Sequence, residues 1–202
     1  MTEPANDRPR PQPTPDGPGP LSFERFGRAF IDTAVTEERV ESGVGSLAGK
    51  QIAFGPTGVG PAKLIKVTAT GMVGRPTATR IATPGAAPAS FALDVPIQLN
   101  LTVDLGLDKS RFAADVVVHL RPTARPAAPL AIFFDVPPIT ADDVDVTVAP
   151  DGVGASVLQS LARVDREIAK AVARYVVGEL AKPEAVASRT VDLVKTVSGA
   201  PD

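Results

Sequence analysis

The stretch FALDVPIQLNLTVDLGL, residues 91–107, decides the fold of this chain, because a large apolar side chain occupies every odd position. The even positions carry polar or small residues and one proline, Pro96. Successive side chains of a β-strand point to opposite faces of a sheet, so this alternation predicts one long strand with a single buried face. Pro96 cannot donate a backbone hydrogen bond, which places it at an edge of the sheet, or at a bulge or bend.

The same alternation predicts the partners of this strand. Residues 108–110 have the composition of a turn, and the apolar even positions of 112–120 then predict the second strand of a long antiparallel hairpin. Further strands are predicted at 65–73, 130–136 and 144–148. Three prolines mark the connection that leads into residue 130: Pro122, Pro126 and Pro129.

Helices are predicted on both sides of the strands. Apolar residues recur at helical spacing over 22–48, where a serine N-cap begins either two short helices or one kinked helix. Ser156 and Gln159 fit a capping box, in which each side chain satisfies a backbone donor at a helix start. The long amphipathic helix that follows ends at Pro183, and a shorter helix is predicted over 186–194.

These elements define an α+β fold, in which a long, curved antiparallel β-sheet packs on an N-terminal helical segment and on a long C-terminal amphipathic helix. A chain of 202 residues can bury a sizeable core, and residues 21–197 are predicted to form a single domain. Prolines are frequent in residues 1–20, which predicts a disordered tail, either solvated or a docking arm for a proline-recognising partner. Residues 198–202 are predicted to be a disordered C-terminus.

Composition excludes several classes of function. The formal net charge is −2 and the basic residues form no stripe or patch, so no nucleic-acid partner is expected. The chain has no cysteine, which rules out a disulfide, a thiolate metal site and a thiol nucleophile. We expect neither a secretory signal nor a transmembrane segment, and therefore a soluble, cytoplasmic protein.

The ionisable residues point to no particular reaction chemistry. His119 is the only histidine, and its parity places it on the polar face of its strand, where a solvated or hydrogen-bonded role is expected. Asp142, Asp143 and Asp145 are close in sequence, and Ca²⁺ prefers such oxygen ligands. The glycine and the distal glutamate of a helix–loop–helix calcium site are missing, so we predict a charged turn and no metal site.

Two further patterns resemble functional motifs without matching them. Residues 55–60, GPTGVG, lack the lysine and hydroxyl residue that follow a phosphate-binding loop, so a hairpin-type loop is predicted and no nucleotide cofactor. Asp94, Asp104 and Asp115 share the polar strand face, where carboxylates are usually solvated rather than paired for hydrolysis. With no serine-nucleophile motif either, we predict no catalytic residues, no cofactor and no enzymatic activity.

The order of the elements resembles the tubular lipid-binding superfamily over residues 21–195: helices first, then long antiparallel strands, then a long amphipathic helix. In that superfamily a strongly curved sheet wraps a long helix around an apolar tunnel. The order also resembles, less closely, the helix-grip domains of the START and polyketide-cyclase type, which usually begin with a strand. Both resemblances imply an apolar ligand, such as a lipid or a polyketide, and both are fold-level analogies.

The leading hypothesis is therefore a non-enzymatic carrier or sensor of an apolar ligand, held between the curved sheet and the helices. Seven apolar side chains are predicted to line the pocket: Phe30, Leu99, Leu101, Val103, Phe134, Leu161 and Ile168. The alternative is a structural or interaction module, in which the same surface packs completely or pairs between two subunits. A homodimer and transient membrane contact both stay open.

Overall fold

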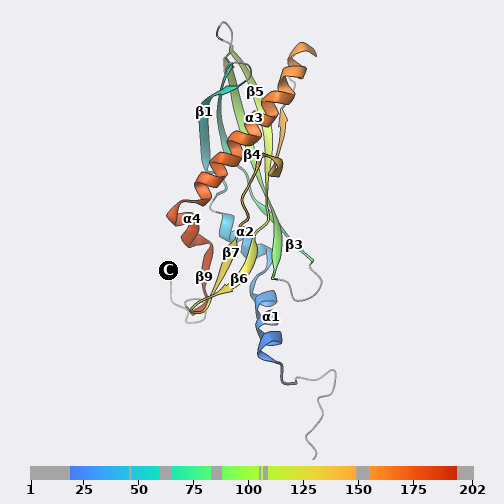
Figure 1. The fold of residues 1–202 in the computed structure, drawn as a ribbon, viewed down its shortest axis with the longest axis vertical. Helices are drawn as coiled ribbons and strands as arrows, with labels where there is room; N and C mark the ends of the chain where they lie inside the picture. Colours follow the sequence, from blue (N-terminus) through green and yellow to red (C-terminus); the bar gives the residue numbers. More distant parts are fainter. Residues whose placement is uncertain are drawn as a thin grey trace, which may run out of the picture. The chain divides into compact units, whose positions relative to one another are not determined.

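The computed structural model divides the chain into two compact units, Met1–Ala34 and Val35–Asp202, and each is considered by itself. Backbone and side chains are described over residues 19–45, 47–58, 66–82, 88–104, 106, 109–148 and 165–194. For residues 59, 65 and 155–164 only the backbone is described. Figure 1 shows the helices and strands coloured along the sequence. Most of the predicted tail 1–20, and all of 198–202, lie outside the described residues.

The first unit contains the helix α1 (Phe23–Ala34), and the sequence explains where it begins. The Ser22 hydroxyl accepts a hydrogen bond from the backbone N–H of Arg25 at 3.2 Å, as the predicted serine N-cap should. Phe26 and Phe30 stack one helical turn apart, with ring centroids 6.5 Å from each other. No residue of α1 is buried, so its phenylalanines form no part of the described core.

The predicted long strand is confirmed as β4 (Ser90–Asp104). Its odd-numbered residues from 91 to 103 are all buried, with exposed fractions between 0% and 7%. Its even-numbered residues are half-buried or exposed. β5 (Lys109–Leu120) pairs antiparallel with β4 along most of its length, which confirms the hairpin. The turn between the two strands lies partly outside the described residues.

Pro96 lies where β4 changes partner on its other side. At this point β2 (Ile65–Val73) has ended its ladder with β4, and β3 (Thr77–Ile81) has not yet begun its own. Between the two ladders the Pro96 carbonyl accepts a hydrogen bond from the Gly74 N–H at 2.8 Å. The missing proline donor therefore falls at a local edge, which is one of the positions that the sequence predicts for it.

The prediction of a hairpin loop at 55–60 is wrong, because most of that stretch belongs to strand β1 (Gln51–Val59). β1 pairs antiparallel with β2, and a bulge that begins after Phe54 takes up the extra residues. Gly55 has a φ of +101°, and a Cβ there would lie 2.5 Å from the Val67 carbonyl oxygen. Glycine at this position is what allows the strand to continue through the bulge.

The proline-marked connection after β5 contains a strand that the sequence did not predict, β6 (Thr123–Ala127). It pairs antiparallel with the predicted strand β7 (Ala131–Asp135), and it meets β4 where Ser90 lies opposite Thr123. Among the described residues, β6 has no strand on its other side beyond Thr123. Pro126 is tolerated there because a strand with a neighbour on one side only does not need every backbone N–H group as a hydrogen-bond donor.

The predicted helix over 186–194 is wrong over residues 190–192. The helix α4 (Pro183–Ser188) ends early, and strand β9 (Thr190–Asp192) then pairs antiparallel with β7. Thr190 and Val191 are β-branched and favour extended backbone. Their partner strand lies far away in the sequence, so local periodicity could not reveal this pairing.

The long C-terminal helix is confirmed as α3 (Ala155–Leu180), and the predicted strand before it as β8 (Val144–Val148). The capping-box residues Ser156 and Gln159 lie where only the backbone is described. β8 pairs with β5, which gives the strand run β1-β2-β4-β5-β8. α3 contacts β1 and β8, the two outer strands of this run, and the short helix η2 (Ala141–Asp143). Figure 1 shows α3 lying across the curled half-barrel.

A helix separate from α1 completes the predicted N-terminal helical segment. This helix, α2 (Glu37–Gly45), packs beside β3. Glu37 and Glu41, one helical turn apart, accept hydrogen bonds from the backbone N–H groups of Arg80 and Ala78 on β3. These N–H groups belong to the side of β3 that faces away from β4, so α2 covers an edge that would otherwise be open.

Candidate functional site

The candidate site is the apolar interior between the curled sheet and α3. The inward side chains of β2, β4, β5 and β8 are nearly all aliphatic or aromatic, and among the described residues no polar or charged residue is fully buried. The buried side chains of α3 are mostly small or β-branched: Ile168, Ala169, Ala171, Val172 and Ala173. Such an interior can hold apolar groups, and it offers no acid–base pair at its centre.

The interior is closed along β4 and more accessible on the side of β5 and β8. Leu101 and Ile168 have exposed fractions of 1% and 2%. On the β5–β8 side of the sheet, the inward side chains of Phe112, Val146 and Val148 are only half-buried, and Phe112 lies directly opposite Leu101. We call the region lined by these three residues the open end. The central side chains are packed against their neighbours, whereas the open end keeps accessible apolar surface.

Small residues flank the leucines of β4 on the neighbouring strands. Leu99 lies opposite Gly71 on β2 and opposite Ala114 on β5. A Cβ on Gly71 would lie 2.6 Å from Leu99 Cδ2 and 2.2 Å from the Gln98 carbonyl oxygen. Glycine therefore leaves the space that the Leu99 side chain fills. The alternation in 65–73 places Gly71 on the inward face, but nothing in the pattern marks it as a packing residue.

The structure places four of the seven predicted ligand-binding residues in the interior of the second unit. Leu99, Leu101 and Val103 share the inward face of β4, and Ile168 is buried on α3. These positions agree with the periodicity that suggested them. Their role in ligand binding stays a prediction.

Of the other three predicted residues, only Phe134 can be compared in position with these four. Phe134 is half-buried on β7, whose described link to β4 runs through β6 and Ser90. Ser90 lies nine residues before Leu99, about 30 Å along a straight strand. Phe30 lies on α1 in the first unit and is 39% exposed. The side chain of Leu161 lies outside the described residues.

His119 is hydrogen-bonded on the outer face of the sheet, as its parity predicts. Its Nδ1 lies 2.8 Å from Asp94 Oδ1 on β4, and its Nε2 lies 3.0 Å from Asp145 Oδ2 on β8. The hydrogen bond to Asp94, and then that to Asp145, raise the pKa of His119 above its ordinary value, against the opposing effect of burial. A ring that donates from both nitrogens is an imidazolium, so His119 braces three neighbouring strands.

The acidic cluster at 142–145 is divided between two structural roles. Asp143 Oδ2 accepts hydrogen bonds from the Thr140 N–H at 2.8 Å and from its hydroxyl at 2.9 Å. These bonds hold the pKa of Asp143 below its usual value. Asp145 is bonded instead to His119. In the part of the chain that the structure describes, no group of three or more acidic or histidine side chains could hold a metal ion.

The three outward carboxylates of the β4–β5 hairpin have separate surroundings. Asp94 belongs to the histidine brace. Asp104 accepts a hydrogen bond from the Gly106 N–H at 2.9 Å and lies 3.4 Å from Lys109 Nζ. Asp115 is exposed on β5. A hydrolase with paired carboxylates needs two of them close together on opposite sides of one bond, and this arrangement does not supply that geometry.

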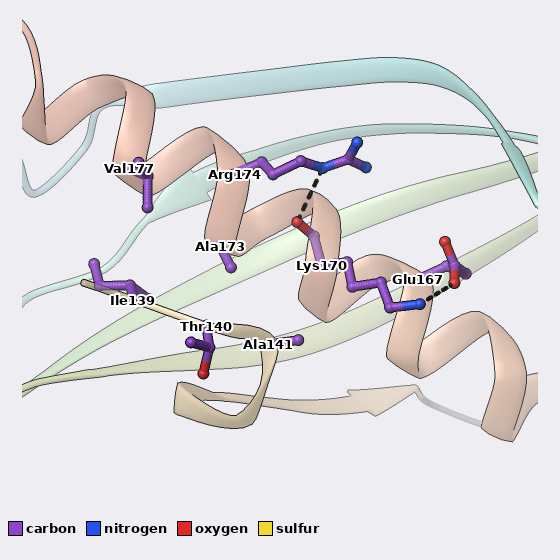
Figure 2. A pocket seen from close by; sticks show the side chains of 8 residues that line it. All are labelled: Ile139, Thr140, Ala141, Glu167, Lys170, Ala173, Arg174 and Val177. Atoms are coloured by element: carbon purple, nitrogen blue, oxygen red, sulfur yellow. Dashed lines mark hydrogen bonds and ion pairs between the residues drawn. The ribbon is translucent and has the colours of Figure 1, made fainter.

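An open groove lies where α3 meets the segment before β8 (Figure 2). It has a volume of about 470 Å³ and is lined in part by Ile139, Thr140 and Ala141 of that segment and by Glu167, Lys170 and Arg174 of α3. Lys170 Nζ lies 2.7 Å from Glu167 Oε1, and Arg174 Nε donates to the Lys170 carbonyl oxygen at 3.3 Å. The groove is a charged surface feature, and its α3 residues lie on another side of the helix from Ile168 and Val172.

Asp165 is a residue of the interior that sequence reasoning missed. It lies on α3, it is half-buried, and burial raises the pKa of its carboxyl group. Its Oδ1 atom has less than 1 Å² of accessible surface and, among the described residues, no hydrogen-bond partner. A signal for it exists in the sequence, because Asp165 falls inside the apolar stripe of the long helix, where a charge is out of place.

Comparison with models of known protein families gives no match, and neither does comparison with curated proteins. The fold itself defines the class of the protein: an α+β protein in which a long helix crosses a curled antiparallel half-barrel. None of the described helices is long and apolar enough to cross a membrane.

Proposed function

We propose that this protein binds an apolar ligand, such as a lipid, at the open end of the interior, and that it does so without catalysing a reaction. The observation that carries the proposal is the change across the sheet, from closed at Leu101 and Ile168 to half-buried at Phe112, Val146 and Val148 on β5 and β8. Apolar side chains that face inward and still keep accessible surface are typical of small-molecule sites.

The position of α3 supports the proposal. The helix contacts the sheet at the two outer strands of the run, β1 and β8. Its buried residues include Ala169 and Ala171, which contribute little side-chain volume between the helix and the central strands. A helix held at both margins over a curled sheet is also the arrangement of the tubular lipid-binding superfamily, and membership of that class is part of the proposal.

The proposal gives the predicted ligand-binding residues two different roles. Val103, the most exposed of the four at 7%, contacts the ligand directly. Leu99, Leu101 and Ile168 form the closed floor beside the open end, because their exposed fractions of 1–2% leave no space for a ligand unless they move. Truncating a floor residue should therefore affect stability more than ligand affinity.

A structural or interaction module is the second candidate, and the closed centre of the interior favours it. Val172 is 0% exposed and Leu101 is 1% exposed, which is the packing of a complete core. On this alternative, the half-buried residues of the open end form the margin of that core or a contact surface for another chain.

Two measurements distinguish the candidates. Native mass spectrometry of protein purified without detergent should show a copurified apolar molecule. Titration with N-phenylnaphthylamine, a neutral dye that fluoresces in apolar surroundings, should show saturable binding.

A matched pair of variants then locates the site. Val148→Asp places a charge at the open end and should weaken dye binding about tenfold or more. Thr147→Asp places the same charge on the outer face of the same strand, where the side chain is exposed, and should leave dye binding unchanged. Absence of dye binding and of any copurified ligand would support the interaction module instead.

A further inference from the structure

The buried stripe of α3 contains one ionisable residue among its described members. Asp165 precedes Ile168, Ala169 and Val172 by three, four and seven residues, so the helical period places the four side chains on one face. The three apolar members of this set are buried. Aspartate is rare in such surroundings unless it is paired.

The carboxylate of Asp165 has an unmet hydrogen-bonding requirement. Its Oδ1 atom is shielded from solvent and has no hydrogen-bond partner in the described part of the protein. In proteins, the great majority of buried polar atoms are hydrogen-bonded. An oxygen that is shielded and has no partner among the described residues is therefore a suitable acceptor for a donor that a ligand brings.

Asp165 lies on the helix that contacts β8, the strand that carries two of the three residues of the open end. Farther along the helix, Glu167 and Lys170 face the groove formed with segment 139–141, which precedes β8 (Figure 2). α3 also contacts β8 itself, where Val146 and Val148 are half-buried. The helical period places Asp165 on the face of Ile168 and Val172, not on the groove face of Glu167 and Lys170.

We propose that Asp165 binds the polar head of the apolar ligand and that this head donates hydrogen bonds, as a primary amine or a hydroxyl group at the end of a hydrocarbon chain does. The inference rests on the proposed function, because the hydrocarbon chain needs the open end. An ammonium head adds an opposite charge to the hydrogen bond, and such charge-assisted bonds are the stronger ones. A fatty acid would bring a second negative charge to a carboxylate that is already poorly solvated. The order of affinity is amine, then alcohol, then fatty acid.

Three ligands with the same chain length test this order: decylamine, decanol and decanoate, each titrated calorimetrically into the full chain at neutral pH. The unmodified protein should bind decylamine about tenfold or more tightly than decanoate. Asp165→Asn keeps the size of the side chain and removes its charge, so the preference should largely disappear. Glu167→Gln removes the same charge from the groove side of the same helix, and the preference should remain.

The outcomes separate this inference from the proposed function. Equal binding of the three ligands, or an unchanged preference in Asp165→Asn, overturns the inference and leaves the proposed function in place, because the apolar chains still bind. If none of the three ligands binds, the inference is overturned, and the response to N-phenylnaphthylamine decides whether the proposed function falls with it.

A second measurement tests whether the carboxylate is unpaired in the free protein. Asp165→Asn should not lower the melting temperature of the ligand-free protein, since the aspartate has no hydrogen bond at Oδ1 to lose. A fall of several degrees would reveal a partner inside the protein and would overturn the inference.

Discussion

Neighbouring side chains of β4 differ in how much they contribute to the stability of the fold. Leu101 is 1% exposed, whereas Asn100 is exposed on the opposite face. Leu101→Ala should lower the free energy of unfolding by about 2–5 kcal/mol, through lost transfer energy and the cavity left behind. Asn100→Asp should change it by about 0.5 kcal/mol or less, as at an ordinary surface site. Urea denaturation measures both values, and equal losses at the two positions would contradict a one-faced strand.

His119 makes the stability of the protein depend on pH. Its folded-state pKa is raised by Asp94 and Asp145, so the stabilisation is fully present below the pKa of a free imidazole, about 6.5, and is lost as the pH rises through the higher folded-state value. The side chain is 37% exposed, so solvent screening should limit the effect to about 1 kcal/mol or less.

The titration can be observed directly, because His119 is the only histidine and gives a single set of imidazole signals in NMR. Asp145→Asn should lower the His119 pKa, since it removes one charged acceptor. Asp115→Asn, an exposed carboxylate on the same strand face, should have a much smaller effect. A His119 pKa at or below about 6.5 in the unmodified protein would contradict the brace.

At the scale of secondary-structure elements, the strands that could be predicted are those in which apolar residues recur at every second position. β2, β4, β5, β7 and β8 have this property, so they could be recognised in the sequence. β1 was missed because Gly55 and a bulge interrupt its alternation, and β6 because Pro126 is compatible only with a one-sided strand. β3 and β9 are short; β9 pairs with β7, which is distant in the sequence, whereas β3 pairs with the consecutive strand β4.

The candidate site could be predicted only in part, for a related reason. The alternation correctly places Leu99, Leu101 and Val103 on the inward face. It cannot distinguish a closed floor from an open end, because that difference depends on where α3 crosses the sheet. Asp165 was missed because the stripe of the helix was traced through apolar residues only.

Replacing either of two glycines in different elements with alanine should change the stability of the protein, but in opposite directions. Gly71→Ala places a Cβ against the Gln98 carbonyl oxygen and Leu99, and should destabilise the protein by about 1–3 kcal/mol. Gly43 lies in α2, where a Cβ would meet no neighbouring atom within 4 Å, so Gly43→Ala should stabilise the helix by about 0.5–1 kcal/mol. Thermal and urea unfolding of both variants show whether each substitution raises or lowers the free energy of unfolding. Destabilisation of similar size in both would show that Gly71 has no special packing role.

At the scale of the whole molecule, residues 1–20 should contribute little to stability. Their sequence contains almost no large apolar side chain to bury. Deletion of 1–20 should leave the melting temperature within about two degrees of that of the full chain. Deletion of 1–45 also removes α2 and its buried Val40, and should lower the melting temperature clearly. A loss of several degrees from the shorter deletion would show that the tail packs on the folded part.

The hydrogen bonds from β3 to α2 bear on how the protein behaves when it is concentrated. A strand of a second molecule could add to β3 only by pairing with the N–H groups of Ala78 and Arg80, which Glu41 and Glu37 already occupy. The double variant Glu37→Ala, Glu41→Ala should free both donors, and its sedimentation coefficient should then rise with protein concentration more steeply than that of the unmodified chain. Resistance to polymerisation at this edge would thus depend on two surface glutamates, independently of whatever the interior binds.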